Sequence, residues 1–100
     1  MTNTTKTPAK TWFITGASRG IGAEIVRAAL AAGDRVVATG RDAQAIARLF
    51  ERDVERVLPL PLDVTRESDA ILAVEAAIAR FGRIDVLVNN AGYGLLGAFE

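Results

Sequence analysis

The sequence predicts an α/β fold in which helices cover both faces of a parallel, doubly wound sheet of four strands and three helices. Short apolar and β-branched runs alternate with stretches of helical period between residues 11 and 88. A glycine-rich segment joins the first run to the first helical stretch. Half of the 100 residues are apolar, which is enough for a buried core. Alternating strands and helices form right-handed βαβ units.

The first βα unit follows a polar leader, residues 1–10, which we expect to be flexible. A β-branched and aromatic strand over residues 11–15 stops at Gly16. The first helix is expected from Gly20, with Gly33 as its stop signal. Its apolar positions at helical spacing are Ile21, Ile25, Ala28, Ala29 and Ala32. A second strand is expected over residues 35–39.

The second unit begins at Asp42, a suitable N-cap for a helix that carries Ile46, Leu49 and Phe50. The third strand is expected over residues 57–62. Pro59 and Pro61 are two residues apart in it, so both nitrogens that lack a hydrogen face the same edge of the strand. An edge strand tolerates this arrangement.

The third helix is expected to begin at Glu67 or Ser68 and to end at Gly82. Its predicted apolar stripe consists of Ile71, Val74, Ile78 and Phe81. A fourth strand over residues 84–88 follows, and a further helix could begin within residues 95–99. The predicted sheet is incomplete at its carboxyl end, where the last strand presents an unprotected edge. We assign residues 11–100 to this truncated domain.

Composition excludes several functions. Twelve basic residues balance twelve acidic ones, so no broad field for nucleic acid is expected. The chain has no cysteine and no histidine, which excludes disulfides, thiolate metal sites and a histidine general base. We therefore expect no metal site. No apolar stretch is long enough to span a bilayer, and we expect a cytoplasmic protein.

The segment from Thr15 to Gly22 reads Thr-Gly-Ala-Ser-Arg-Gly-Ile-Gly. Glycines here allow a sharp turn and close approach of the backbone to a pyrophosphate, which the free N–H groups of a helix start also favour. A glycine-rich turn that binds nothing is the alternative, and the strand before and the helix after disfavour it. The predicted phosphate-binding residues are Gly16, Ser18, Arg19, Gly20, Ile21 and Gly22.

This segment resembles the Thr-Gly-x-x-x-Gly-x-Gly loop of the short-chain dehydrogenase/reductase family, in its short, non-extended branch. Two further stretches are similar to that family: Asn89-Asn90-Ala91-Gly92 after the fourth strand, and Asp63-Val64 after the third. The resemblance implies a Rossmann-like fold. It also implies that Asn90, Ala91 and Gly92 lie by a ribose and that Asp63 and Val64 contact adenine. Without it, an Asn-rich turn and a helix-capping Asp63 explain the same residues.

The end of the second strand indicates which dinucleotide binds. NAD-specific folds place an acid there, about 20 residues after the glycine loop, to hold the ribose 2′-hydroxyl. Here Gly40 takes that place and Arg41 follows. A guanidinium binds a 2′-phosphate bidentately, and Arg19 could reach the same phosphate. In the family, basic residues at these positions accompany NADP(H), so we predict NADP rather than NAD.

The resemblance implies an NADP(H)-dependent oxidoreductase that acts on a small carbonyl or alcohol substrate and is a homo-oligomer when complete. In the family, a serine and a Tyr-x-x-x-Lys pair do the chemistry. The chain's one tyrosine, Tyr93, is followed four residues later by Gly97, and its lysines are Lys6 and Lys10. We therefore assign no catalytic residue. The alternatives are a dinucleotide-binding fragment or sensor without catalysis and, with weaker support from the sequence, a methyltransferase.

Overall fold

The computed structural model describes residues 8–91, which form a four-stranded parallel sheet with helices on both faces. The strand order is β3-β2-β1-β4. The strands are β1 (Thr11–Ile14), β2 (Arg35–Gly40), β3 (Val57–Pro61) and β4 (Val86–Val88). The helices are α1 (Gly20–Ala31), α2 (Ala43–Leu49) and α3 (Glu67–Phe81), with a 3₁₀ helix, η2 (Glu51–Asp53), after α2.

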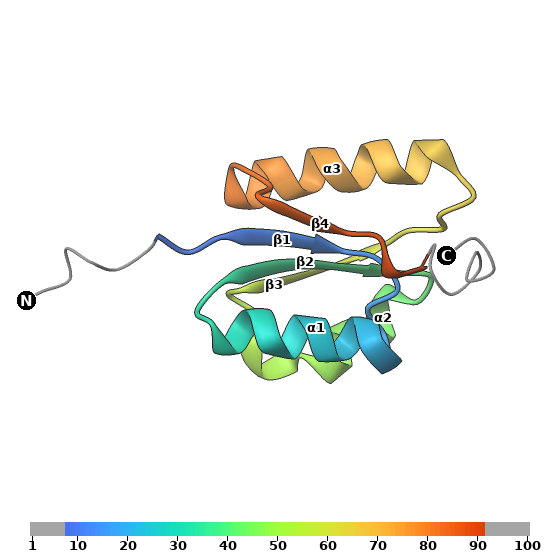
Figure 1. Cartoon of the computed structure of the whole chain (residues 1–100). Helices are drawn as coiled ribbons and strands as arrows, with labels where there is room; N and C mark the ends of the chain where they lie inside the picture. The colour runs from blue at the N-terminus through green and yellow to red at the C-terminus, as the bar shows by residue number, and fades with distance from the viewer. Residues whose placement is uncertain (1–7, 92–100) are drawn as a thin grey trace, which may run out of the picture.

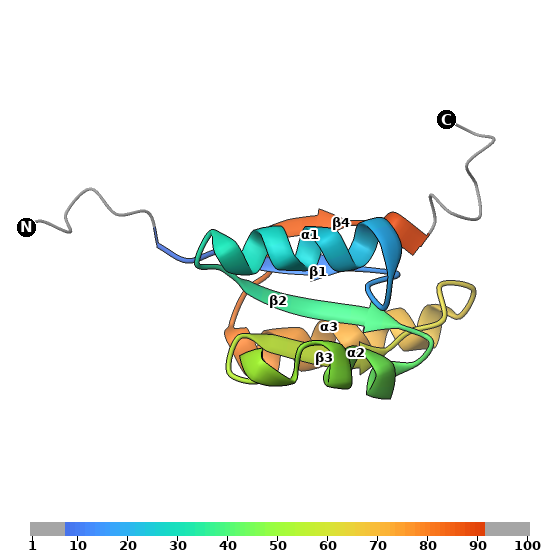
Figure 2. The same cartoon turned by 90° about the horizontal axis from the view of Figure 1, so that it is seen from below.

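The helices divide between the two faces of the sheet (Figure 1): α3 covers one face, and α1 and α2 cover the other. Figure 2 shows the latter face, where α1 lies over β1 and also contacts β2, and α2 lies against β3. The predicted doubly wound α/β fold is therefore confirmed. The first, third and fourth strands are shorter than predicted, and the second extends one residue further, to Gly40.

Strand β3 forms one edge of the sheet, as its two prolines predicted. The N–H of Leu62 donates to the Gly40 carbonyl at 2.8 Å. The backbone N–H and C=O groups of the even-numbered residues therefore point toward β2. Because successive backbone groups alternate in direction, Pro59 and Pro61 turn their N–H-free positions outward. The outer edge of β3 therefore lacks two of its donors.

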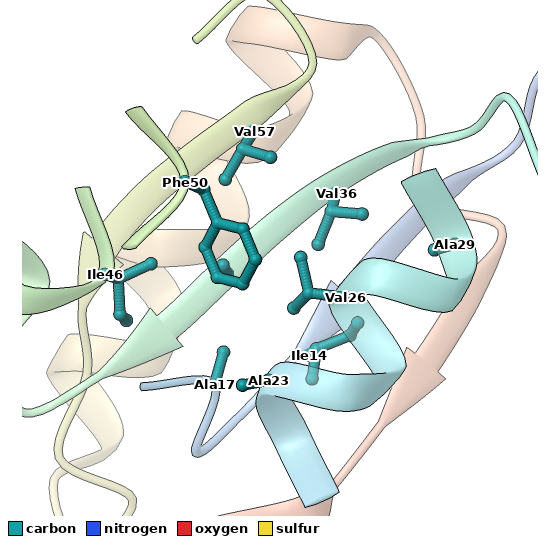
Figure 3. Packing of buried hydrophobic residues seen from close by; sticks show 10 residues of the cluster. Ile14, Ala17, Ala23, Val26, Ala29, Val36, Ile46, Phe50 and Val57 are labelled. Carbon is teal, nitrogen blue, oxygen red and sulfur yellow. The ribbon is translucent and has the colours of Figure 1, made fainter. Parts of the chain in front are cut away.

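The core between the sheet and α1 and α2 is apolar and closely packed (Figure 3). It corrects part of the predicted face of α1, because Ile21, Ala28 and Ala32 are exposed. Ala29 is buried as predicted, and the helix buries Gly22, Ala23 and Val26 beside it. These residues also recur at helical spacing, and the contact of Gly22 with the glycine loop selects their face over the predicted one.

Helix α3 packs through small residues, which makes its predicted stripe wrong for three of the four positions. Ala73 and Ala77 are buried against Phe13, Val37 and Leu62. Ile71, Val74 and Ile78 are between 43% and 53% exposed, on the flank of the helix. Phe81 alone of the predicted four packs against that core. Alanines let the helix approach the sheet closely, so the larger side chains remain at its side.

The helix ends agree with the sequence. Asp42 accepts a hydrogen bond from the Ala45 N–H at 3.0 Å, which confirms it as the N-cap of α2. Helix α3 starts at Glu67 and ends at Gly82, whose φ of +86° is left-handed. None of the helices in the described part of the chain has the length and apolarity needed to cross a bilayer.

Two carboxylates fix the beginning of β1. Asp34 accepts from the Lys10 N–H at 3.0 Å and from Trp12 Nε1 at 2.9 Å. Asp85 accepts from the Thr11 N–H at 2.8 Å. These donors lower the pKa of Asp34 and of Asp85, and Arg83 adds to the effect on Asp85. The backbone is thus anchored from Lys10 onward, while residues 1–7 of the predicted leader lie outside the described residues.

Candidate functional site

A cleft of about 900 Å³ opens at the carboxyl ends of the parallel strands. This is where ligands bind in open α/β sheets. The structure brings residues from all three predicted motifs into its wall. The lining consists of Gly16, Ser18, Arg19, Gly20, Ile21, Gly40, Arg41, Asp42, Ala45, Leu62, Val64, Asn90 and Ala91. No group of three or more acidic, histidine or cysteine side chains that could hold a metal occurs among residues 8–91.

The glycine loop forms the floor of this cleft, and it folds tightly against itself. Gly16 has a left-handed φ of +63°, and a Cβ there would lie 2.9 Å from Asn90 Nδ2. A Cβ on Gly22 would overlap the carbonyl oxygen of Gly16. Neither position has space for a side chain. Gly22, which was predicted to bind phosphate, therefore packs against the Gly16 carbonyl and is not among the residues that line the cleft.

The Asn-Asn-Ala turn after β4 is joined to this loop by hydrogen bonds. Asn90 Nδ2 donates to the Gly16 carbonyl at 3.0 Å. Thr15 Oγ1 accepts from the Ala91 N–H at 2.9 Å and donates to Asn89 Oδ1 at 3.3 Å. The Thr15 N–H also donates to the Val88 carbonyl oxygen at 3.0 Å. Thr15 was absent from the predicted binding residues, although it is the first residue of the motif, and its contacts make it a positioning residue for the turn.

The start of α1 faces the cleft without a side-chain cap. Arg19 is the N-cap residue, its backbone is extended, and no side-chain oxygen in the described chain accepts from the first turn. The first N–H groups of a helix have no partners within the helix, and the helix dipole makes that end positive. Gly20 and Ile21 belong to this turn and line the cleft. These features suit a phosphate group.

Two guanidinium groups line the same cleft, from Arg19 and Arg41. Both residues are exposed, and neither forms an ion pair with a carboxylate among residues 8–91. Asp42, the acid beside Arg41, directs its carboxylate to the Ala45 N–H, as the sequence predicted for a capping residue. Its charge is therefore engaged at the start of α2.

The Asp63-Val64 pair divides between two roles. Val64 lines the cleft. The Asp63 carboxylate is not part of that lining and accepts from the Thr65 hydroxyl at 2.6 Å and the Thr65 N–H at 2.9 Å. These bonds lower the pKa of Asp63, and the nearby charge of Arg41 acts in the same direction. The Asp63 side chain thus shapes the turn before α3.

Sequence reasoning missed Leu62 and Ala45 as cleft residues. Leu62 follows β3, and Ala45 lies in the first turn of α2. The rule that ligands bind at the carboxyl ends of parallel strands would have identified Leu62. Gly40, which stands where an NAD-specific fold has its acid, lines the cleft at the end of β2. Gly92, a predicted cofactor-binding residue, and the tyrosine Tyr93 lie outside the described residues.

Known proteins share both the sequence and the fold. The pattern of the short chain dehydrogenase family matches residues 10–100. Oxidoreductase BOA17 of Botryotinia fuckeliana is 48% identical over 92 residues, which cover 91% of this chain and 34% of that protein. A short-chain dehydrogenase structure from Streptomyces avermitilis has a TM-score of 0.77 and 43% identity, covering 83% of this chain and 31% of that one.

A structure with bound cofactor is also similar. The 3-ketoacyl-(acyl-carrier-protein) reductase of Brucella melitensis, complexed with NADH, has a TM-score of 0.74 and 33% identity, over 78% of this chain and 32% of that one. The chain spans about a third of the length of the relatives it matches.

Proposed function

The chain belongs to the short-chain dehydrogenase/reductase family, and on that basis we propose that it is the dinucleotide-binding portion of an NADP(H)-dependent oxidoreductase. The reaction is hydride transfer between the nicotinamide and a carbonyl or alcohol carbon of a small substrate. This portion binds and orients the cofactor, while groups outside residues 8–91 supply the acid/base chemistry.

The observation that carries the NADP(H) preference is the composition of the cleft wall after β2. Gly40 stands where an NAD-specific fold has its acid, and Arg41 and Arg19 line the same cleft. A 2′-phosphate needs donors and positive charge, which two guanidinium groups provide. The Asp42 carboxylate, held at the Ala45 N–H, does not neutralise them through an ion pair.

The residues present fit a dinucleotide. Gly16 and Gly22 leave no side chain between the loop and the helix start, so backbone N–H groups can approach a pyrophosphate. Ser18 adds a hydroxyl at the same wall, and Val64 with Leu62 offers an apolar surface for adenine. Asn90 and Ala91 close the side next to β4. When bound, the cofactor supplies the hydride or accepts it.

Binding and selectivity are tested together on the complete natural protein that contains this sequence. Dissociation constants for NADPH and NADH are measured by calorimetry, and oxidation of each is followed with a panel of small aldehydes and ketones. We expect binding of both with a preference for NADPH of at least about tenfold, which corresponds to about 1.4 kcal/mol. Equal or stronger binding of NADH would reject the proposed preference, and binding of neither would reject the function.

A second candidate is a dinucleotide-binding protein without catalysis, such as a sensor. The observation that favours dinucleotide binding by itself is that residues of all three motifs line one cleft, which both candidates share. It predicts tight NADPH binding with no turnover of any carbonyl in the panel by the complete protein.

We further propose that the complete protein acts in the cytoplasm as a homo-oligomer, on a small-molecule substrate and without nucleic acid or a membrane as partner. Light scattering on the purified complete protein tests the assembly, and cell fractionation tests the compartment. A monomer, or recovery in the membrane fraction, would contradict these proposals.

A further inference from the structure

Position 40 ends β2 directly beside the cleft, and its surroundings limit which residue it can hold. Gly40 is buried, and its carbonyl accepts from the Leu62 N–H at 2.8 Å. A Cβ at this position would lie 3.2 Å from Ile46 Cδ1 and 3.9 Å from the Ala17 N–H nitrogen. The first of these distances is tighter than in most real Cβ contacts. A side chain at position 40 therefore requires Ile46 to shift by a few tenths of an ångström.

Ile46 has little freedom to move. Its exposed fraction is 0%, and it packs in the core cluster that includes Ala17 and Phe50. Figure 3 shows it beside the end of β2, with Phe50 and Ala17 among its neighbours. Helix α2, which carries it, is held at its start by the bond from the Ala45 N–H to Asp42. In a core packed to crystal density, such a shift displaces further side chains.

The contact concerns the position that decides between the two dinucleotides. An NAD-selective site needs a carboxylate at the end of the second strand, and a carboxylate needs the Cβ that Ile46 opposes. Resting on the proposed function, we propose that Ile46 is a specificity-determining residue. It keeps an acidic side chain out of position 40, so that Gly40→Asp alone does not convert the 2′-phosphate site of Arg41 to a 2′-hydroxyl site.

The cofactor preference can be changed in two ways. Removing Arg41 weakens the attraction for a phosphate, and Ile46 does not oppose it. Adding an acid at position 40 is the second way, and it depends on the size of residue 46. Shortening Ile46 to valine removes Cδ1, the atom nearest the new Cβ. A paired change is therefore expected to achieve what the single change does not.

The test is a double-mutant cycle on the complete natural protein, with Gly40→Asp, Ile46→Val and both together. Without nucleotide, the effect of Gly40→Asp on the folding equilibrium constant is measured by urea unfolding in two backgrounds. The factor by which Gly40→Asp lowers this constant should be at least about five times smaller in the Ile46→Val background than in the wild-type background. With nucleotide, the ratio of the NADPH to the NADH dissociation constant should rise at least about fivefold more in the double variant than the product of the single effects.

Two matched controls separate a local contact from general loosening of the core. Gly40→Ala adds only the Cβ and should couple to Ile46→Val in unfolding in the same direction. Ile14→Val makes the same change at another fully buried isoleucine of the same cluster and should not relieve Gly40→Asp.

The proposal is overturned if Gly40→Asp and Ile46→Val are additive in unfolding, if Ile14→Val relieves the acid equally well, or if Gly40→Asp alone shifts the cofactor ratio as far as the double variant. The unfolding cycle uses no nucleotide. A wild-type protein that prefers NADH would therefore reject the proposed NADP(H) preference, while the unfolding cycle still decides whether Ile46 excludes a side chain.

Discussion

The Nδ2 of Asn90 lies 3.0 Å from the carbonyl oxygen of Gly16, although 74 residues separate the two along the chain. This bond connects the turn after β4 to the glycine loop after β1. The loop is held so close to its neighbours that a Cβ on Gly16 would meet Asn90 and a Cβ on Gly22 would meet the Gly16 carbonyl. The shape of the glycine loop therefore depends on a residue from the far end of the described chain.

Replacing Asn90 with alanine should loosen the glycine loop without removing a ligand to the phosphates. If the loss of one hydrogen bond, about 0.5–1.5 kcal/mol, is carried into binding, NADPH should bind about two- to thirteenfold more weakly, measured by calorimetry on the complete protein. Ser68→Ala, at an exposed position of α3, is the control and should leave the dissociation constant unchanged. Unaltered binding by Asn90→Ala would show that the loop keeps its shape alone.

Arg41→Asp should move the cofactor preference toward NADH. The variant loses a charge-assisted bond to the 2′-phosphate and gains a repelling carboxylate, so NADPH binding should weaken at least about tenfold while NADH binding changes less. Arg52→Asp makes the same charge change in η2, away from the cleft lining, and should preserve the ratio. Equal losses for both nucleotides in Arg41→Asp would mean that Arg41 does not read the 2′ position.

Gly22→Ala should damage both stability and binding, because the new Cβ overlaps the Gly16 carbonyl. Overpacking of this kind costs about 1–3 kcal/mol, visible as a lower urea midpoint, and the displaced loop should bind NADPH at least about tenfold more weakly. Ala28→Ser, on the exposed side of the same helix, should stay within about 0.5 kcal/mol of the parent. A variant as stable as the parent would contradict the close approach seen here.

Acid should release the anchors of β1. The pKa values of Asp34 and Asp85 are lower in the folded chain than the ordinary 3.8. Each carboxylate thus contributes stability that is fully present above that value and is lost as the pH falls through the folded pKa. Urea unfolding from pH 7 to pH 2 should show the stability gap between parent and Asp34→Asn/Asp85→Asn narrowing below about pH 4.

The control for this series is Glu24→Gln, which removes the exposed ion pair with Arg27. Such pairs contribute little, so the variant should follow the parent across the whole range. A gap between parent and double variant that stays constant with pH would refute the anchoring role of the two charges.

The flank of α3 should make residues 1–100 self-associate when produced alone. Ile71, Val74 and Ile78 are about half exposed on one side of the helix, and Leu87 of β4 is 69% exposed on the same face of the sheet as Phe13. Apolar surface of this kind promotes association. Light scattering should show a mass that rises with concentration and falls in Ile78→Lys. Leu72→Lys, on the opposite flank, should have the smaller effect.

The sequence predicted the order and type of every strand and α-helix because its periods are clear and its stop signals, such as Gly33 and Gly82, are strong. It predicted the buried faces of α1 and α3 only in part, through Ala29 and Phe81. Alanine fits both a core and a surface, so the alternation of Ala73 and Ala77 with larger residues pointed to the wrong stripe. Close helix–sheet approach decided the outcome.

The candidate site was predictable where one motif specifies one backbone shape. Residues of the glycine loop line the cleft, and Asp42 caps α2 as expected. What the sequence could not provide were contacts between distant segments, such as Thr15 with Ala91, and the turn of the Asp63 carboxylate toward Thr65. The 3.2 Å distance that Ile46 leaves at position 40 likewise depends on the tertiary packing of α2.

The two prolines of β3 also limit how this margin of the sheet can meet another molecule. Pro59 and Pro61 offer no N–H to an incoming strand at the edge that β3 forms. A strand that approaches β3 from a second copy would find carbonyl groups without the alternating donors that complete a β-ladder. Strand addition at this edge is therefore disfavoured.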